Sequence, residues 1–91
     1  MTDAIRRRVV VYGRVQGVFF RDTCRREAAA RGVAGWVTNR ADGAVEAVFE
    51  GPRDSVGAMV EWARHGPPWA DVKQIDTHPE PLEGIAGFHV R

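Results

Sequence analysis

The sequence has only one cysteine and almost no net charge. Because Cys24 stands alone among 91 residues, no disulfide can form within the chain, and the absence of a cysteine framework in so small a chain fits a reducing, intracellular setting. We expect Cys24 to be a small, buried, apolar side chain. Thirteen basic and twelve acidic residues leave a formal net charge of +1, so no overall field attracts nucleic acid or an acidic membrane. Any affinity for anions must therefore be local.

The sequence also lacks long apolar runs and metal-ligand spacing. Only four apolar residues, 9–12, follow the N-terminal arginines, too few for the core of a signal peptide or a membrane span. We therefore expect a soluble cytoplasmic protein. His65, His78 and His89 fall on three separate segments, so we expect them on the surface and expect no metal or other cofactor.

Apolar patterning predicts one small α+β domain over residues 1–91. A chain of this length has room for a single core. Short runs rich in β-branched and aromatic residues predict strands, and apolar residues three or four apart predict helices. The predicted strands cover residues 9–12, 35–40, 44–50, 69–76 and 88–91, and the predicted helices cover residues 21–31 and 52–65.

Turn-forming residues separate these elements. Asp42 and Gly43 mark a hairpin turn between the second and third strands, and we expect Pro52 at the first position of the second helix. The prolines within residues 77–84 predict a loop there. The order strand, helix, strand, strand, helix, strand is typical of a ferredoxin-like βαββαβ domain, in which an antiparallel sheet carries both helices on one face.

The loop between the first strand and the first helix is a candidate anion site. It lies within the segment GRVQGVFFR, which runs from Gly13 to Arg21. Unpaired N–H groups and the positive end of the helix dipole meet at such a junction, and Gly13 and Gly17 allow the loop to curl its amides around a phosphate. A cation at the position of Arg21 opposes the dipole at a cost of about 0.3–1 kcal/mol unless an anion is near. Because a guanidinium can bind two phosphate oxygens, we expect a phosphoryl site here.

Plainer explanations of the same residues remain open. The glycines could only shape a turn, and Arg21 could pair with Asp22, Glu27 or another surface carboxylate. The loop lacks the Gly-Lys-Ser/Thr ending of a Walker A motif, which disfavours nucleotide hydrolysis with magnesium.

Asn39 lies near the end of the second predicted strand, just before the hairpin turn. Asparagine is common in turns, but its amide also offers the donor and acceptor that could hold a water molecule in line with a phosphorus atom. A phosphate ester leaves as an alkoxide and usually needs a general acid or a metal. An acyl phosphate leaves as a carboxylate whose conjugate acid has a pKa of about 4, so an arginine, a ring of amides and a positioned water could suffice.

Two motifs give the sequence a strong resemblance to the acylphosphatase family. Members of this family carry a motif like GxVQGVxFR after the first strand and GWVxN in the second, which stand here at residues 13–21 and 35–39. The resemblance continues through DGAVEAVFEG at residues 42–51 and GPP at residues 66–68. It therefore covers essentially the whole chain.

The resemblance implies a fold, a reaction and a site. The fold is ferredoxin-like, and the reaction is hydrolysis of acyl phosphates to a carboxylate and inorganic phosphate. Arg21 binds the substrate phosphate and Asn39 orients the attacking water, with no metal, organic cofactor or phosphoenzyme. By the same resemblance, the main-chain amides that cradle the phosphate belong to Val15, Gln16, Gly17, Val18, Phe19 and Phe20.

Two other classes of protein fit part of the sequence. A ferredoxin-like RNA-binding module could place the arginines at residues 6–8 on backbone phosphates, but the strand at residues 44–50 lacks the aromatic stacking signature of such modules and carries two glutamates, so a solvated strand end explains the arginines better. A non-catalytic anion-sensing domain could keep the loop without hydrolysis, although Asn39 argues against it. Similar domains occur fused to carbamoyl-transferring maturation proteins; we expect this chain to act alone, as a monomer.

Overall fold

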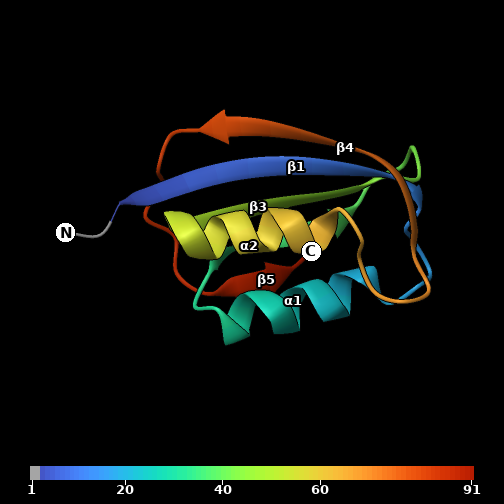
Figure 1. Ribbon diagram of the computed structural model, residues 1–91, viewed down its shortest axis with the longest axis horizontal. Helices are drawn as coiled ribbons and strands as arrows, with labels where there is room; N and C mark the ends of the chain where they lie inside the picture. The colour runs from blue at the N-terminus through green and yellow to red at the C-terminus, as the bar shows by residue number, and fades with distance from the viewer. Residues whose placement is uncertain (1–2) are drawn as a thin grey trace.

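The computed structural model describes residues 3–91, which form a layer of two helices on one five-stranded sheet. Both helices cover the same face of the sheet (Figure 1), and the strand order is β4-β1-β3-β2-β5. The chain runs β1 (Ala4–Arg14), α1 (Phe20–Ala30), β2 (Ala34–Asn39), β3 (Val45–Pro52), α2 (Arg53–Ala63), β4 (Asp71–Glu80) and β5 (Phe88–Val90).

The predicted ferredoxin-like α+β fold is confirmed, with one difference in the sheet. β1, β3, β2 and β4 pair antiparallel, but β5 pairs parallel with β2. The sheet is therefore mixed, and the expectation of a purely antiparallel sheet is wrong. The reason is that the short last strand returns along the free edge of β2 in the same direction as β2.

The hydrophobic core lies between the sheet and the helices. Helical spacing places Cys24 and Ala28 of α1, and Val56 and Met59 of α2, on the buried sides of the two helices, where none of them has exposed area. Val9 of β1 faces them from the sheet. The prediction that Cys24 is a buried apolar side chain is confirmed, and burial raises the pKa of its thiol. No helix within residues 3–91 is long and apolar enough to cross a membrane.

The opposite face of the sheet carries a nearly buried ion pair. Arg6 on β1 is 4% exposed and donates to Glu50 on β3 at 3.0 Å, and it also contacts Glu80 on β4 at 3.3 Å. Burial opposes ionisation of Glu50, but hydrogen bonds from two N–H groups of the β4–β5 connection and from Arg6 outweigh it and hold the pKa of Glu50 below its usual value. The interpretation of the arginine run as a solvated strand end is therefore wrong. β1 extends well beyond the predicted residues 9–12, and its arginines have acidic partners on both neighbouring strands.

Two predictions based on proline are also wrong. β4 begins two residues later than predicted and continues through Pro79, where the sequence predicted a loop over residues 77–84. The strand tolerates this proline because β4 lies at the edge of the sheet and pairs only with β1, so one N–H group is dispensable. Pro52 ends β3 with an extended ψ of 140° and immediately precedes α2 instead of occupying its first position.

Candidate functional site

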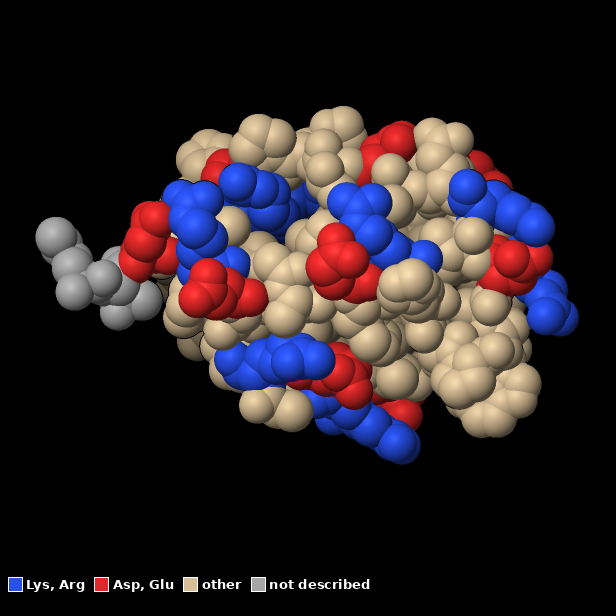
Figure 2. Space-filling view, in the orientation of Figure 1, with Lys and Arg blue, Asp and Glu red and all other residues tan. Residues whose placement is uncertain are grey.

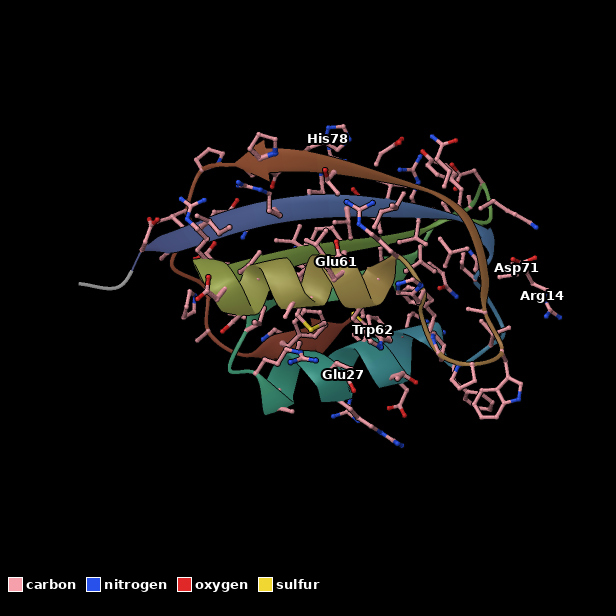
Figure 3. All side chains as sticks on the ribbon, in the orientation of Figure 1. Arg14, Glu27, Glu61, Trp62, Asp71 and His78 are labelled. Atoms are coloured by element: carbon pink, nitrogen blue, oxygen red, sulfur yellow. The ribbon has the colours of Figure 1, made fainter. Side chains whose placement is uncertain are left out.

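Four strands begin or end at one end of the sheet. Arg14 at the end of β1 pairs with Asp71 at the start of β4, and both are labelled at this end in Figure 3. Val11 of β1 pairs with Val45 of β3, which also pairs with Asn39, the last residue of β2. The loop after β1 therefore lies between the start of β4 and the end of β2.

Buried side chains fix the loop that joins β1 to α1, residues 15–19. Val15 and Val18 of the loop and Phe20 at the start of α1 are at most 7% exposed and belong to the core. The ring of Phe20 packs on Trp62 of α2 with 5.1 Å between ring centroids. Each of these contacts buries apolar area, so the loop is held by the same hydrophobic effect that holds the helices.

The backbone of this loop leaves its N–H groups available. Gly17 and Phe19 adopt left-handed conformations, with φ of 72° and 64°, and such residues can turn successive N–H groups toward one side. In the part of the chain that the structure describes, no hydrogen bond uses the main-chain N–H groups of residues 16–19. The N-terminus of α1 has no side-chain cap, so its first N–H groups are free as well.

Gly13 has a different role from the one predicted. It belongs to β1, at the register shift between Tyr12 and Gly13, and is not part of the loop. A Cβ atom there would overlap the main-chain oxygen of Asp71, whereas a Cβ at Gly17 would meet nothing within 4 Å. Gly13 is therefore needed for the close approach of β4, and Gly17 only for its left-handed backbone.

A pocket of about 510 Å³ opens beside the loop. Of the predicted site residues, only Gln16 and Val18 are not among those that line it. Asp22 and Val90 line it without having been predicted: Asp22 follows Arg21 directly in the sequence, but no sequence signal places β5 next to β2. The lining residues are Val15, Gly17, Phe19, Phe20, Arg21, Asp22, Asn39 and Val90.

Arg21 brings to this pocket a cation that no acidic side chain neutralises. The alternative that it pairs with Asp22 or Glu27 is wrong, because both carboxylates have other partners and Arg21 forms no ion pair with an acidic side chain within residues 3–91. The hydrogen bond from Arg25 holds the pKa of Asp22 below its usual value. The partners are Arg25 at 2.9 Å and Arg26 at 2.8 Å for Asp22, and Arg31 at 3.3 Å for Glu27.

The last residues of the chain hold the Arg21 side chain. Its Nη1 donates to the main-chain oxygen of Arg91 at 3.4 Å, and the hydroxyl of Thr38 on β2 donates to the same oxygen at 3.3 Å. The guanidinium therefore keeps most of its donors available to a ligand.

Asn39 faces the pocket with an uncommitted side chain. It is half-buried, and its side-chain amide forms no hydrogen bond within residues 3–91. The neighbouring turn is stabilised by Asp42, whose carboxylate accepts the N–H of Ala44 at 3.0 Å. Asn39 is therefore not required to form the turn.

Gln16 has a side-chain role that the sequence did not indicate. Its Nε2 donates to the carbonyl oxygens of Arg40 at 2.8 Å and Ala44 at 3.0 Å, so both amide hydrogens tie the loop to the β2–β3 hairpin. The sequence motif indicated only the main-chain amide of Gln16. Because Arg40 follows Asn39, these bonds set the position of Asn39 relative to the loop.

The three histidines do not contribute to this pocket. His65, His78 and His89 are exposed, as predicted. Among residues 3–91, no group of three or more histidine, cysteine or acidic side chains is placed to hold a metal ion.

The fold and the pocket together define a small ferredoxin-like domain with a loop of unused main-chain N–H groups beside a pocket at one end of its sheet. A sequence model of the acylphosphatase family matches residues 7–90, and the chain belongs to the acylphosphatase family, whose members are hydrolases. It is 50% identical over 91 residues to an acylphosphatase of Natronomonas pharaonis, covering 100% of this chain and 99% of that protein.

Solved structures agree with this assignment. The crystal structure of an acylphosphatase from Bacillus subtilis has 41% sequence identity and a TM-score of 0.92, covering 96% of this chain and 98% of that chain. The structure of an acylphosphatase from Coxiella burnetii has 39% identity and a TM-score of 0.93, covering 98% and 94%. The family predicted from the two sequence motifs is confirmed.

We predict that alanine affects the two glycines of the motif very differently. Gly13→Ala should lower the free energy of unfolding by more than about 2 kcal/mol, because the new Cβ overlaps the backbone of β4. Gly17→Ala should cost only about 1 kcal/mol, the price of a left-handed alanine in open space. Urea denaturation of both variants measures the difference. Equal losses would show that β4 can move away from Gly13 without penalty.

Proposed function

We propose that the β1–α1 loop and Arg21 bind the phosphoryl group of an acyl phosphate while Asn39 orients the water that attacks it. The products are a carboxylate and inorganic phosphate. The observation that carries this proposal is the meeting, in one pocket, of unused main-chain N–H groups, a guanidinium with no acidic side-chain partner and an uncommitted side-chain amide.

The phosphoryl half of the site consists of donors only. The N–H groups of Val15, Gln16, Gly17, Val18, Phe19 and Phe20 and the guanidinium of Arg21 match the oxygens of a phosphoryl group. The one carboxylate in the pocket lining, that of Asp22, is neutralised by Arg25 and Arg26, so it does not repel the substrate strongly. Donors fixed before the substrate arrives can stabilise the charge of the transition state without reorganisation.

Asn39 supplies the remaining function, which is to hold the nucleophile. Its amide oxygen accepts a hydrogen bond from water and its NH₂ group donates one to a phosphoryl oxygen, so water and phosphorus are aligned. Gln16 fixes the hairpin that carries Asn39. Because the leaving group is a weakly basic carboxylate, the reaction needs neither a strong general acid nor a metal ion.

The setting in which the enzyme acts is part of the same proposal. We place it in the cytoplasm, as a monomer that binds a small-molecule acyl phosphate and no nucleic acid. The near-zero net charge argues against binding of nucleic acid. So do Arg6 and Arg8, which could otherwise contact a nucleic acid but pair with glutamates of β3 and β4.

Hydrolysis should survive removal of metal ions. We expect the chelator-treated protein to release inorganic phosphate from acetyl phosphate and benzoyl phosphate at the rate of the untreated protein, because every proposed contact to the phosphoryl group comes from the chain. A phosphate-release assay with and without a chelator measures this. Activity that fell with the chelator and returned with added magnesium would contradict the proposed chemistry.

Arg21→Gln should weaken binding of inorganic phosphate about 10- to 100-fold, because it removes charge-assisted hydrogen bonds. Turnover should fall at least as far. Arg31→Gln is the matched control, since Arg31 flanks the opposite end of α1 and pairs with Glu27. Isothermal titration with phosphate and an acetyl phosphate assay measure both effects. Normal phosphate binding by the Arg21 variant would remove Arg21 from the site.

Asn39→Ala should lower kcat by about 100-fold and leave phosphate binding within about threefold, because orienting water matters chiefly in the transition state. Gln74→Ala, which removes a side-chain amide from the exposed strand β4, is the control. Steady-state kinetics and phosphate titration separate the two quantities. A parallel loss of phosphate affinity would make Asn39 a ligand of the substrate rather than of the water.

A further inference from the structure

Two exposed aromatic side chains lie together beside the pocket. Phe19 is 70% exposed and Trp69 is 62% exposed, and their rings meet edge to face with 6.0 Å between centroids. Single exposed apolar residues are normal on protein surfaces, but adjoining aromatic rings at a pocket form an apolar patch of the kind that binds ligands. The proposed binding of phosphate uses only the main chain of Phe19 and nothing of Trp69.

The backbone is fixed at both residues, and the two rings contact each other. Phe19 is left-handed and lies between two residues whose side chains are buried, so its own side chain must point outward. Trp69 follows two prolines, its carbonyl accepts a hydrogen bond from Arg14 at 3.3 Å, and Ala70 closes a turn onto Pro67 at 3.0 Å. A ligand that contacts the pair therefore meets a surface that needs little ordering.

The pair lies on the side of the loop away from Asn39. In the sheet order β4-β1-β3-β2-β5, Trp69 precedes the edge strand β4 and Asn39 ends β2, with the loop after β1 between them. In-line attack on phosphorus places the leaving group opposite the water. A water held by Asn39 therefore directs the acyl group toward Phe19 and Trp69. Figure 2 shows a continuous uncharged surface at the lower right, where the β1–α1 and α2–β4 connections lie in Figure 1.

We propose that Phe19 and Trp69 form a subsite for the acyl group and that the enzyme selects acyl phosphates with an aromatic or bulky apolar acyl group. This rests on the proposed function, since the phosphoryl group must first be held by the loop. An aromatic acyl group can pack on the two rings and bury apolar area. An acetyl group has one methyl and gains little from the same contact.

The test compares benzoyl phosphate with acetyl phosphate. We expect wild type to have the higher kcat/KM for benzoyl phosphate, and Trp69→Ala to lower the benzoyl-to-acetyl ratio of kcat/KM about fivefold, mainly through KM for benzoyl phosphate. Trp69→Phe, which keeps a ring, should restore most of the ratio. Leu82→Ala, which removes an exposed apolar side chain outside the pocket lining, should keep the wild-type ratio. The inhibition constant of inorganic phosphate should stay within twofold in all variants.

Different failures have different meanings in this experiment. If wild type hydrolyses neither substrate, the proposed function falls. If it hydrolyses both and Trp69→Ala keeps the wild-type ratio, the acyl subsite falls and the function stands. A loss of selectivity in Val90→Ala instead of Trp69→Ala would place the acyl group on the β5 side and overturn the proposal. Light scattering gives the mass of the wild type and of Trp69→Ala in solution. If the wild type forms an oligomer that the variant does not form, the patch serves contacts between copies of the chain, and the proposal is overturned.

Discussion

The burial of Val15, Val18 and Phe20 is the constraint on which the site depends. Because these side chains occupy the core, the loop between them has little freedom, and its remaining residues must adopt conformations that fit. Phe19 accepts a left-handed backbone that costs a non-glycine residue about 1–2 kcal/mol. The outcome is a loop that buries Val15 and Val18, exposes Phe19 and leaves the N–H groups of residues 16–19 unused. Hydrophobic burial thus provides the rigidity that the proposed phosphate site requires.

The two faces of the sheet make separate contributions to the end of the molecule that carries the pocket. The helical face anchors the loop. On the opposite face, Arg6 and Glu50 form the nearly buried ion pair, and Glu50 also accepts two N–H groups of the β4–β5 connection. That connection leads into β5, which supplies Val90 to the pocket lining and is followed by the Arg91 oxygen that Arg21 contacts. The position of Arg21 therefore depends partly on charges that lie across the sheet from the core.

Local sequence patterns predicted those features of the fold that depend on residues close together in the chain. The apolar run of β1, the stripes of both helices and the Asp42–Gly43 turn need only near neighbours, and they were found. The course of β4 through Pro79, the pairing of β5 and the burial of Arg6 depend on which strand lies at an edge and on partners distant in sequence, so no local pattern contained them. For the same reason, the motifs indicated Arg21 and Asn39 as site residues but not Val90 or the side-chain bonds of Gln16.

The two halves of the proposed site differ in the chemical groups that build them. The phosphoryl half uses main-chain N–H groups, which every residue except proline possesses, so its geometry depends on backbone conformation more than on side-chain identity. The acyl half uses the side chains of Phe19 and Trp69, both of which are exposed and outside the core. Substitutions there can change the acyl group that is accepted at little cost to folding. A fixed phosphate cradle beside an adjustable apolar surface allows one reaction to be kept while the choice of substrate varies.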